Sequence, residues 1–316
     1  MTVPGLPMTV PSRDLPTRVR IHEVGARDGL QNEKATVPTV IKAEFIRRLA
    51  GAGLTTIEAT SFVHPKWVPQ LADAEQLFPV VADLPVALPV LVPNERGLDR
   101  ALALGARRVA VFASATESFA KANLNRTVDE ALAMFEPVVT RAKADAVHVR
   151  GYLSMCFGDP WEGGVPIPQV VRVCRALLDM GCDELSLGDT IGVATPGHVV
   201  ALLAALDEAG IPPATLAVHF HDTYGQALAN TLAALQQGVT TIDASAGGLG
   251  GCPYAKSATG NLATEDLVWM LRGLGIDTGI DLGRLVATST WMAAHLGRSS
   301  PSRTVRALSH EDTEEH

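Results

Sequence analysis

Short apolar runs alternate along the chain with longer amphipathic stretches. A short apolar run bounded by turn residues is typical of a buried strand, whereas apolar residues three and four apart are typical of a helix packed on one face. Eight such pairs follow one another. The predicted strands are residues 18–24, 55–60, 86–91, 108–113, 147–155, 184–187, 215–220 and 241–245, and the predicted helices are residues 40–52, 70–78, 94–104, 128–144, 169–180, 196–208, 226–237 and 264–274.

This alternation predicts an α/β fold with a single (β/α)₈ (TIM) barrel, because eight strand–helix units are the number that closes such a barrel. Residues 281–296 follow the eighth unit and are expected to form extra C-terminal helices outside the barrel. No linker rich in Pro, Gly or Ser divides residues 17–300, so we expect one domain there. The proline-rich residues 1–16 are expected to be a loose N-terminal segment, and residues 301–316 a tail.

Composition and charge exclude several classes of partner. The 316 residues are 47% hydrophobic and carry a formal net charge of −8, which gives no support for binding to nucleic acid or to an anionic membrane. No apolar run is long enough to span a bilayer, and the first residues lack the pattern of a secretory signal. The four cysteines form no Cys-x-x-Cys pair, which argues against a disulfide framework. We therefore expect a cytoplasmic protein.

Polar residues gather at the ends of the predicted strands, where a TIM barrel carries its active site. We therefore expect a functional site at the C-terminal rim of the barrel, which is the edge where the strands end. The residues concerned are Arg27 and Asp28 after the first strand, Glu58 and Ser61 at the second, Asp189 and Thr190 at the sixth, His219 and His221 at the seventh, and the glycine-rich residues 247–254 after the eighth.

His219 and His221 favour a metal site. Alternate positions of a strand point to one side, so both imidazoles face a common point. Asp28 is the best carboxylate to join them, because the first strand closes against the eighth, and Asn261 can add an amide oxygen. Two nitrogen and two oxygen ligands suit six-coordinate Mg²⁺ or Mn²⁺. The alternatives are two histidines that are only hydrogen-bonded and an asparagine that caps the following helix.

Five longer motifs carry a family resemblance. They are EVGARDGLQNE (residues 23–33), TSFVHPKWVPQ (60–70), SLGDTIG (186–192), HFHDTYGQALAN (219–230) and GLGGCPYA (248–255). In these motifs the chain resembles the 3-hydroxy-3-methylglutaryl-CoA lyases, which belong to the metal-dependent lyases and aldol-type synthases with an Arg-Asp-Gly signature. The resemblance implies a divalent-metal-dependent carbon–carbon lyase that forms acetyl-CoA and acetoacetate, as in leucine degradation. It also implies an acyl-CoA substrate and a homodimer.

The resemblance carries roles onto matching residues. Arg27 resembles the residue that stabilises the enolate oxygen, Glu58 the residue that orients this arginine, and Cys252 the catalytic cysteine of a mobile flap. A thiol has an ordinary pKa of about 8.5, which suits acid–base work near neutral pH. The group that deprotonates the substrate hydroxyl is either Asp28 or His219. The implied metal ligands are Asp28, His219, His221 and Asn261, and the implied coenzyme A contacts are Lys34, Ser61, Lys66, Lys121 and Asn123.

Departures from the family pattern leave other functions open. Asp159 stands where the family often has a cysteine, and Trp161 replaces a tyrosine. A lyase for a related 3-hydroxy-3-alkylglutaryl-CoA is therefore an alternative. A synthase of the isopropylmalate type is disfavoured, because those enzymes usually carry Gly-Glu-Arg where this chain has Gly-Gly-Cys at residues 250–252. A non-catalytic barrel is disfavoured by the intact Arg27 and Cys252.

Overall fold

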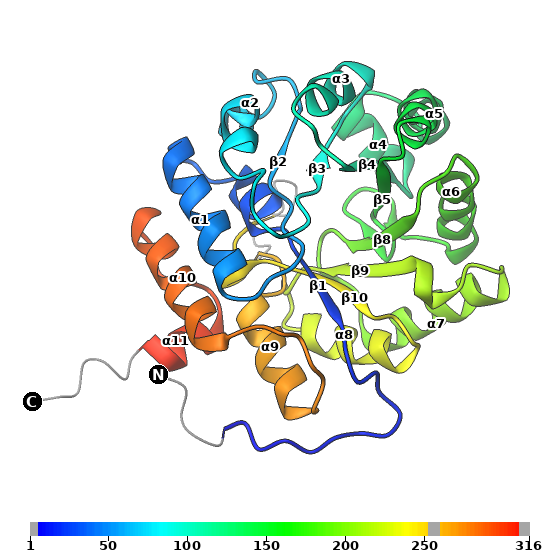
Figure 1. Ribbon diagram of the computed structural model, residues 1–316. Coiled ribbons are helices and arrows are strands. Elements are labelled where there is room, and N and C mark those ends of the chain that lie inside the picture. The colour runs from blue at the N-terminus through cyan, green and yellow to red at the C-terminus, as the bar shows by residue number, and fades with distance from the viewer. Residues whose placement is uncertain (1–5, 252–259, 310–316) are drawn as a thin grey trace, which may run out of the picture.

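The computed structural model describes residues 6–251 and 260–309. Eight parallel strands form one sheet in the order β1-β10-β9-β8-β5-β4-β3-β2, with helices around its outer face (Figure 1). The strands are β1 (Arg20–Glu23), β2 (Thr60–Ser61), β3 (Val90–Leu91), β4 (Arg108–Ser114), β5 (His148–Ser154), β8 (Glu184–Asp189), β9 (Leu216–Phe220) and β10 (Thr241–Ala244).

The sheet closes on itself between β1 and the segment before β2. The backbone N–H of Glu23 donates to the carbonyl of Thr56 over 3.0 Å, and the N–H of Glu58 donates to the carbonyl of Glu23 over 2.8 Å. On its other side β1 pairs with β10 along its whole length. The prediction of a (β/α)₈ barrel is therefore confirmed, and the first, seventh and eighth units lie side by side.

The helices pack their apolar sides on the barrel, as the periodicity predicts. In α6 the residues Val170, Val173, Cys174 and Leu177 are all fully buried, at the spacing of one helix face. The helices are α1 (Thr39–Gly51), α2 (Ala74–Leu77), α3 (Glu95–Ala103), α4 (Glu117–Leu124), α5 (Val128–Ala144), α6 (Ile167–Asp179), α7 (Pro196–Glu208), α8 (Ala227–Gln236), α9 (Thr264–Gly273), α10 (Leu282–His295) and α11 (Arg303–Ser309). Among the described residues, no helix is both long and apolar enough to cross a membrane.

Three predicted elements are shorter than expected. Of the strand predicted over residues 55–60, only Thr60 lies in β2, while Thr56 and Ile57 form isolated bridges. The strand predicted over residues 86–91 is reduced to β3, because Pro89 has no N–H to donate to a ladder. The helix predicted over residues 70–78 is interrupted, with only α2 as α-helix between two 3₁₀ turns, and Pro79 prevents its regular continuation. Two further elements were not predicted: α4, and a two-stranded hairpin of β6 (Gly158–Asp159) and β7 (Gly163–Gly164).

The extra C-terminal helices are present, but the assignment of all residues from 301 to a tail is wrong. Part of this segment forms α11, in which Val305 and Leu308 are buried. The carboxylate of Asp266 on α9 accepts hydrogen bonds from the N–H groups of Arg303 and Thr304. A side chain from α9 thus accepts hydrogen bonds from the free N–H groups at the start of α11. A contact between two helices leaves no mark in the local sequence pattern, so this helix was not predicted.

Candidate active site

The turn after β1 places two charged side chains at the C-terminal rim. Residues Gly25–Gly29 form one turn of π-helix, in which the N–H groups of Arg27 and Gly29 both donate to the carbonyl of Val24. A side chain at Gly29 would come within 2.9 Å of Leu249, so a glycine is needed where this turn meets the chain after β10.

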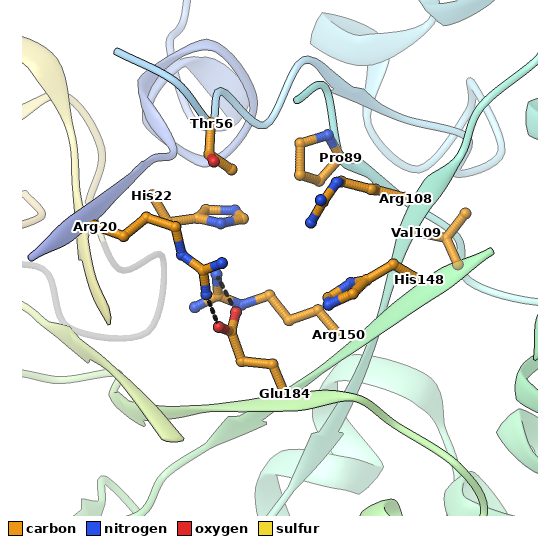
Figure 2. Close-up of a pocket in the computed structure, with 9 residues that line it drawn as sticks. All are labelled: Arg20, His22, Thr56, Pro89, Arg108, Val109, His148, Arg150 and Glu184. Atoms are coloured by element: carbon orange, nitrogen blue, oxygen red, sulfur yellow. Dashed lines mark hydrogen bonds and ion pairs between the residues drawn. The ribbon is translucent and has the colours of Figure 1, made fainter. Parts of the chain in front are cut away.

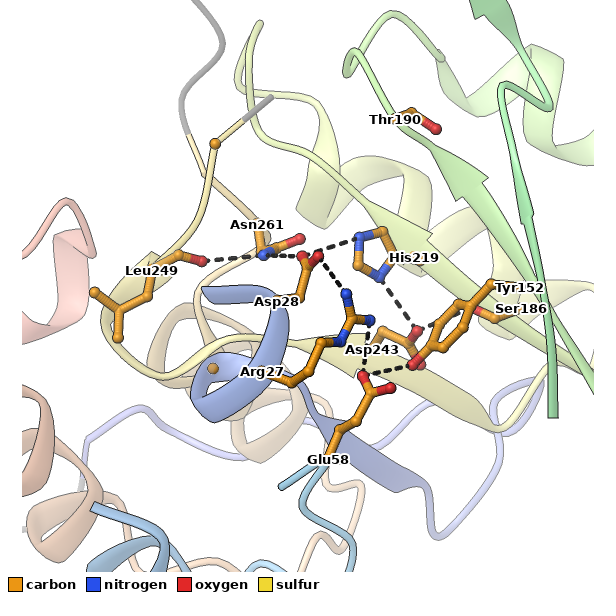
Figure 3. A network of polar contacts seen from close by, with 12 residues as sticks. Arg27, Asp28, Glu58, Tyr152, Ser186, Thr190, His219, Asp243, Leu249 and Asn261 are labelled. Carbon is orange, nitrogen blue, oxygen red and sulfur yellow. Dashed lines mark hydrogen bonds and ion pairs between the residues drawn. The ribbon is translucent and has the colours of Figure 1, made fainter. Parts of the chain in front are cut away.

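The guanidinium of Arg27 is buried between two carboxylates (Figure 3). Its Nη1 donates to Asp28 over 2.8 Å, and its Nη2 donates to Glu58 over 2.8 Å. Glu58 is fully buried and accepts a second hydrogen bond, of 3.0 Å, from the hydroxyl of Tyr152. Burial alone would lower the pKa of Arg27, but Glu58 and Asp28 raise it above its ordinary value. The side chain is therefore a fixed, permanent cation.

Asp28, His219, His221 and Asn261 converge beside this arginine, and we call these four residues the rim cluster. One ligand atom each from Asp28 and the two histidines lie within 4.8 Å of one another. The amide nitrogen of Asn261 donates to Asp28 over 2.8 Å. The alternative in which Asn261 caps the next helix is wrong, because the N-cap of α9 is Ala263.

The rim cluster fits a divalent cation. Nδ1 of His221 and Oδ1 of Asn261 are buried and have no hydrogen-bond partner in the part of the chain that the structure describes. Such atoms each cost about 1–3 kcal/mol unless something pairs with them. Burial, and then the nearby His219, lower the pKa of His221 to about 4, so this imidazole is neutral as metal binding requires. Burial alone would raise the pKa of Asp28, but Arg27 and the histidines lower it, so it is ionised.

Asp243 on β10 is a site residue that the sequence reasoning missed. It is fully buried, lies 3.2 Å from Nδ1 of His219 and accepts hydrogen bonds from Arg150 and Ser186. Burial alone would raise its pKa, but Arg150 and His219 lower it. This carboxylate favours the tautomer of His219 that leaves Nε2 free to face Asp28. The sequence did contain a clue to Asp243. It is a single acidic residue inside a strand predicted to be buried, and acidic residues are rarely buried without a partner.

A second buried carboxylate joins the turn after β1 to the chain after β10. One oxygen of Glu23 accepts hydrogen bonds of 2.8 Å from the N–H groups of Gly25 and Ala246. Its other oxygen accepts from the hydroxyl of Thr264 over 2.6 Å. Burial raises the pKa of Glu23 to about 7.

A third buried carboxylate holds the start of the glycine-rich loop. Glu265 accepts hydrogen bonds from the N–H of Gly247 and the hydroxyl of Ser289, and burial raises its pKa to about 8. The hydroxyl of Ser300 donates to the carbonyl of Gly247 over 2.9 Å. The base of this loop is therefore held at Gly247 by two side chains, Glu265 and Ser300. Cys252, farther along the same loop, lies outside the described residues.

The predicted coenzyme A contacts follow β1, β2 and β4 but do not join the rim cluster. Ser61 is buried at the end of β2. Within the described residues, no hydrogen bond or ion pair links these five side chains to the four residues of the cluster. The exposed ones are Lys34 and Lys66 in loops and Lys121 and Asn123 on α4.

The departure at Asp159 has a structural explanation. One of its oxygens accepts from Thr116 over 2.6 Å, and the other accepts from the N–H groups of Trp161 and Glu162. Asp159 therefore orders the turn of the β6–β7 hairpin through its own carboxylate. In the described part of the chain it makes no hydrogen bond or ion pair with the rim cluster.

Comparisons with known proteins agree with the five motifs. A family model described as HMGL-like matches residues 18–292. A mitochondrial hydroxymethylglutaryl-CoA lyase of Arabidopsis thaliana is 54% identical over 303 residues, which are 96% of this chain and 64% of that relative. The chain thus spans less than two thirds of that relative's length.

Two solved structures cover nearly the whole of both chains. The hydroxymethylglutaryl-CoA lyase of Pseudomonas aeruginosa superposes with a TM-score of 0.92 at 47% identity, over 94% of this chain and 99% of the other. An HMG-CoA lyase of Acinetobacter baumannii, solved with coenzyme A and 3-methylmalate, gives a TM-score of 0.88 at 35% identity, over 97% and 99%.

Proposed function

Because the chain belongs to the HMGL-like family and is an enzyme of the hydroxymethylglutaryl-CoA lyase type, we propose that its C-terminal rim cleaves 3-hydroxy-3-methylglutaryl-CoA. The products are acetoacetate and acetyl-CoA, the latter formed first as its enolate. The observation that carries this proposal is the convergence of Asp28, His219 and His221 beside the buried Arg27.

The rim cluster would hold Mg²⁺ or Mn²⁺ through one oxygen of Asp28, one nitrogen each of His219 and His221, and Oδ1 of Asn261. The two buried atoms without a partner support this assignment. When bound, the cation supplies a Lewis acid that lowers the pKa of the substrate hydroxyl and fixes its orientation. Side chains of Asp28 and His219 retain 23% and 13% exposure, so the cluster is open to a ligand from the rim.

Arg27 would stabilise the oxygen of the enolate. Its Nε is buried without a hydrogen-bond partner among the described residues, which leaves a donor for a ligand. Glu58 and Asp28 fix the guanidinium before the substrate arrives, so no reorganisation is needed when negative charge develops. A donor of this kind is typically worth about 3–4 kcal/mol in the transition state.

Two groups can accept the proton of the substrate hydroxyl. His219 is the stronger base: burial alone would lower its pKa, but Asp243 raises it above the ordinary value. Asp28 is the weaker, because its pKa is lowered. Because Nδ1 of His219 faces Asp243, Nε2 is either the ligand atom for the cation or the base, and it cannot be both at once; when Nε2 holds the cation, Asp28 is the candidate base. When Nε2 is the base, Asp243 would stabilise the imidazolium through Nδ1.

Cys252 remains the predicted acid that protonates the carbanion, on the evidence of the sequence motif alone. We expect the Cys252→Ser variant to bind Mn²⁺ like the wild type and to turn over substrate orders of magnitude more slowly. Cys182→Ser, at a buried position just before β8, is the control and should retain activity. Equal turnover by wild type and Cys252→Ser would remove this residue from the mechanism.

The direct test is incubation of the purified protein with 3-hydroxy-3-methylglutaryl-CoA and Mg²⁺ or Mn²⁺. We expect acetoacetate and acetyl-CoA in equal amounts, and loss of both with excess EDTA. A parallel assay with the 3-ethyl analogue tests the alternative that a longer alkyl group is the true substrate. If neither thioester were cleaved with either metal, the proposal would be overturned, and a non-catalytic binding protein would be the remaining alternative.

A further inference from the structure

A small cavity lies at the N-terminal end of the barrel, opposite the rim cluster (Figure 2). Four of its lining residues are the first residues of four strands: Arg20 of β1, Arg108 of β4, His148 of β5 and Glu184 of β8. Arg150 projects into it from β5. We call this the basal cavity. Figure 2 shows the side chains of Arg108, His148 and Arg150 directed toward its interior.

Positive charge exceeds negative charge around the basal cavity. Among the described residues, three guanidinium groups line it but only one carboxylate, that of Glu184, which pairs with both Arg20 and Arg150. A second carboxylate, Asp243, meets Arg150 from outside the lining. Three cations and two anions leave one positive charge that no carboxylate among these five groups neutralises.

The two histidines do not change this balance. Burial lowers the pKa of His22 well below its ordinary value, with the charge of Arg150 as the next cause, and burial also lowers the pKa of His148. Both rings are therefore neutral near pH 7, and each offers an N–H that can donate to a ligand.

Several donors at the basal cavity are unused. Arg150 is 2% exposed, yet its Nε has no hydrogen-bond partner among the described residues. Arg108 makes no hydrogen bond or ion pair through its side chain within residues 6–251 and 260–309. The Nε of Arg150 is costly to leave unpaired because it is buried, although the rest of the guanidinium is paired. Arg108 is half-buried, so its guanidinium keeps only part of its hydration. This cost points to a ligand that the chain itself does not supply.

We propose that the basal cavity binds one small monovalent anion, with chloride as the physiological ion. The space holds about one water-sized particle, which excludes phosphate, sulfate and carboxylates. A water molecule would satisfy a donor but would leave the excess charge uncompensated. A halide ion accepts hydrogen bonds from several directions and neutralises that charge. It would link the starts of β1, β4 and β5 and so stabilise the N-terminal end of the barrel.

The test compares thermal unfolding in sodium chloride and in sodium gluconate at equal ionic strength. Gluconate is too large for the cavity, so it controls for general screening of charge. We expect the wild type to have a Tm several degrees higher in chloride, because an ion that binds only the folded chain stabilises it. Arg108→Gln should lose this difference. Arg107→Gln, which removes the same charge from an exposed neighbour, should retain it.

Crystals of the wild-type protein grown in bromide provide a second measurement that requires no variant. An anomalous peak between Arg108 and Arg150 would support the proposal. A water molecule at this position, with no bromide, would overturn it. Equal Tm values in chloride and gluconate, or an equal response to chloride in Arg108→Gln and the wild type, would also overturn it.

Discussion

At the residue scale, the two side chains closest to the proposed chemistry are each oriented by a carboxylate behind them. Glu58 fixes Arg27 over 2.8 Å, and Asp243 fixes His219 over 3.2 Å. Neither carboxylate is exposed. The geometry of the site therefore depends on residues that a ligand need not touch, and substitutions there should disturb the orientation of Arg27 or His219 without removing either side chain.

We expect Glu58→Gln to lower kcat by about 10–100-fold with little change in KM, because Arg27 loses the charge that orients it. The isosteric amide can still accept the hydrogen bond that the hydroxyl of Tyr152 donates. Steady-state kinetics with 3-hydroxy-3-methylglutaryl-CoA measure both constants. A kcat equal to that of the wild type would show that Arg27 is held well enough by Asp28 alone.

We expect Asp243→Asn to weaken Mn²⁺ binding by about 10–100-fold, because the amide no longer favours the tautomer of His219 with a free Nε2. Isothermal titration calorimetry measures this affinity. Ser186→Ala is the matched control, since it removes another partner of Asp243 but keeps the carboxylate. If the two variants bound Mn²⁺ equally well, Asp243 would have no role in orienting His219.

The residues of the site differ in how far sequence alone could reveal them. His219 and His221 could be paired because alternate residues of a strand face the same side. Asp28 could be added because the first strand of a barrel always closes against the last. Asp243 could not be paired with His219 in this way. Its partners Arg150, Ser186 and His219 lie on three other strands, and only the folded ring brings them together.

At the scale of elements, the turn after β1 and the start of the glycine-rich loop behave as one unit. Glu23 bonds to both segments, and Glu265 bonds to the loop and to α10. Both carboxylates are fully buried. The start of the glycine-rich loop is thus held by Glu23 and Glu265, two buried carboxyl groups whose pKa is raised.

The stability of this scaffold should depend on pH. The pKa of Glu265 is about 8 in the folded chain, against about 4.5 when exposed. Between these values the folded state binds more protons than the unfolded state, so stability falls as the pH rises. We expect Glu265→Gln to lack this contribution, which is worth at most about 1.4 kcal/mol per pH unit. Urea unfolding of both proteins from pH 5 to pH 8 measures the difference.

Glu208→Gln is the control for this experiment, because Glu208 is exposed at the end of α7. Its free energy of unfolding should follow the wild type at every pH. Parallel curves for the wild type and Glu265→Gln would mean that Glu265 does not hold a proton in the folded chain.

Elements were predicted well where one physical rule dominates. The helix predicted over residues 128–144 is confirmed as α5 at both ends, since a capping box at Thr127 and Glu130 starts it. It continues through Pro137 because packing outweighs one lost hydrogen bond. α11 was missed, because its first turn depends on Asp266 of another helix, and such contacts have no fixed spacing in the sequence.

At the scale of the whole molecule, closure of the ring makes the site possible. Asp28 and Asn261 are separated by 233 positions in the chain, yet they share a hydrogen bond. The order of the strands brings β1 beside β10 and β10 beside β9. The same closure gathers Arg20, Arg108 and Arg150 at the other end. The barrel therefore concentrates ligands for a cation at one end and an excess of positive charge at the other.

Manganese binding tests the central claim most directly. Electron paramagnetic resonance of free Mn²⁺ during a titration gives the number and affinity of bound ions. The account predicts one Mn²⁺ per chain in the wild type, an affinity at least about 100-fold weaker in His221→Ala, and no change in His295→Ala, whose histidine is exposed on α10. Binding of Mn²⁺ to His221→Ala with wild-type affinity would contradict it.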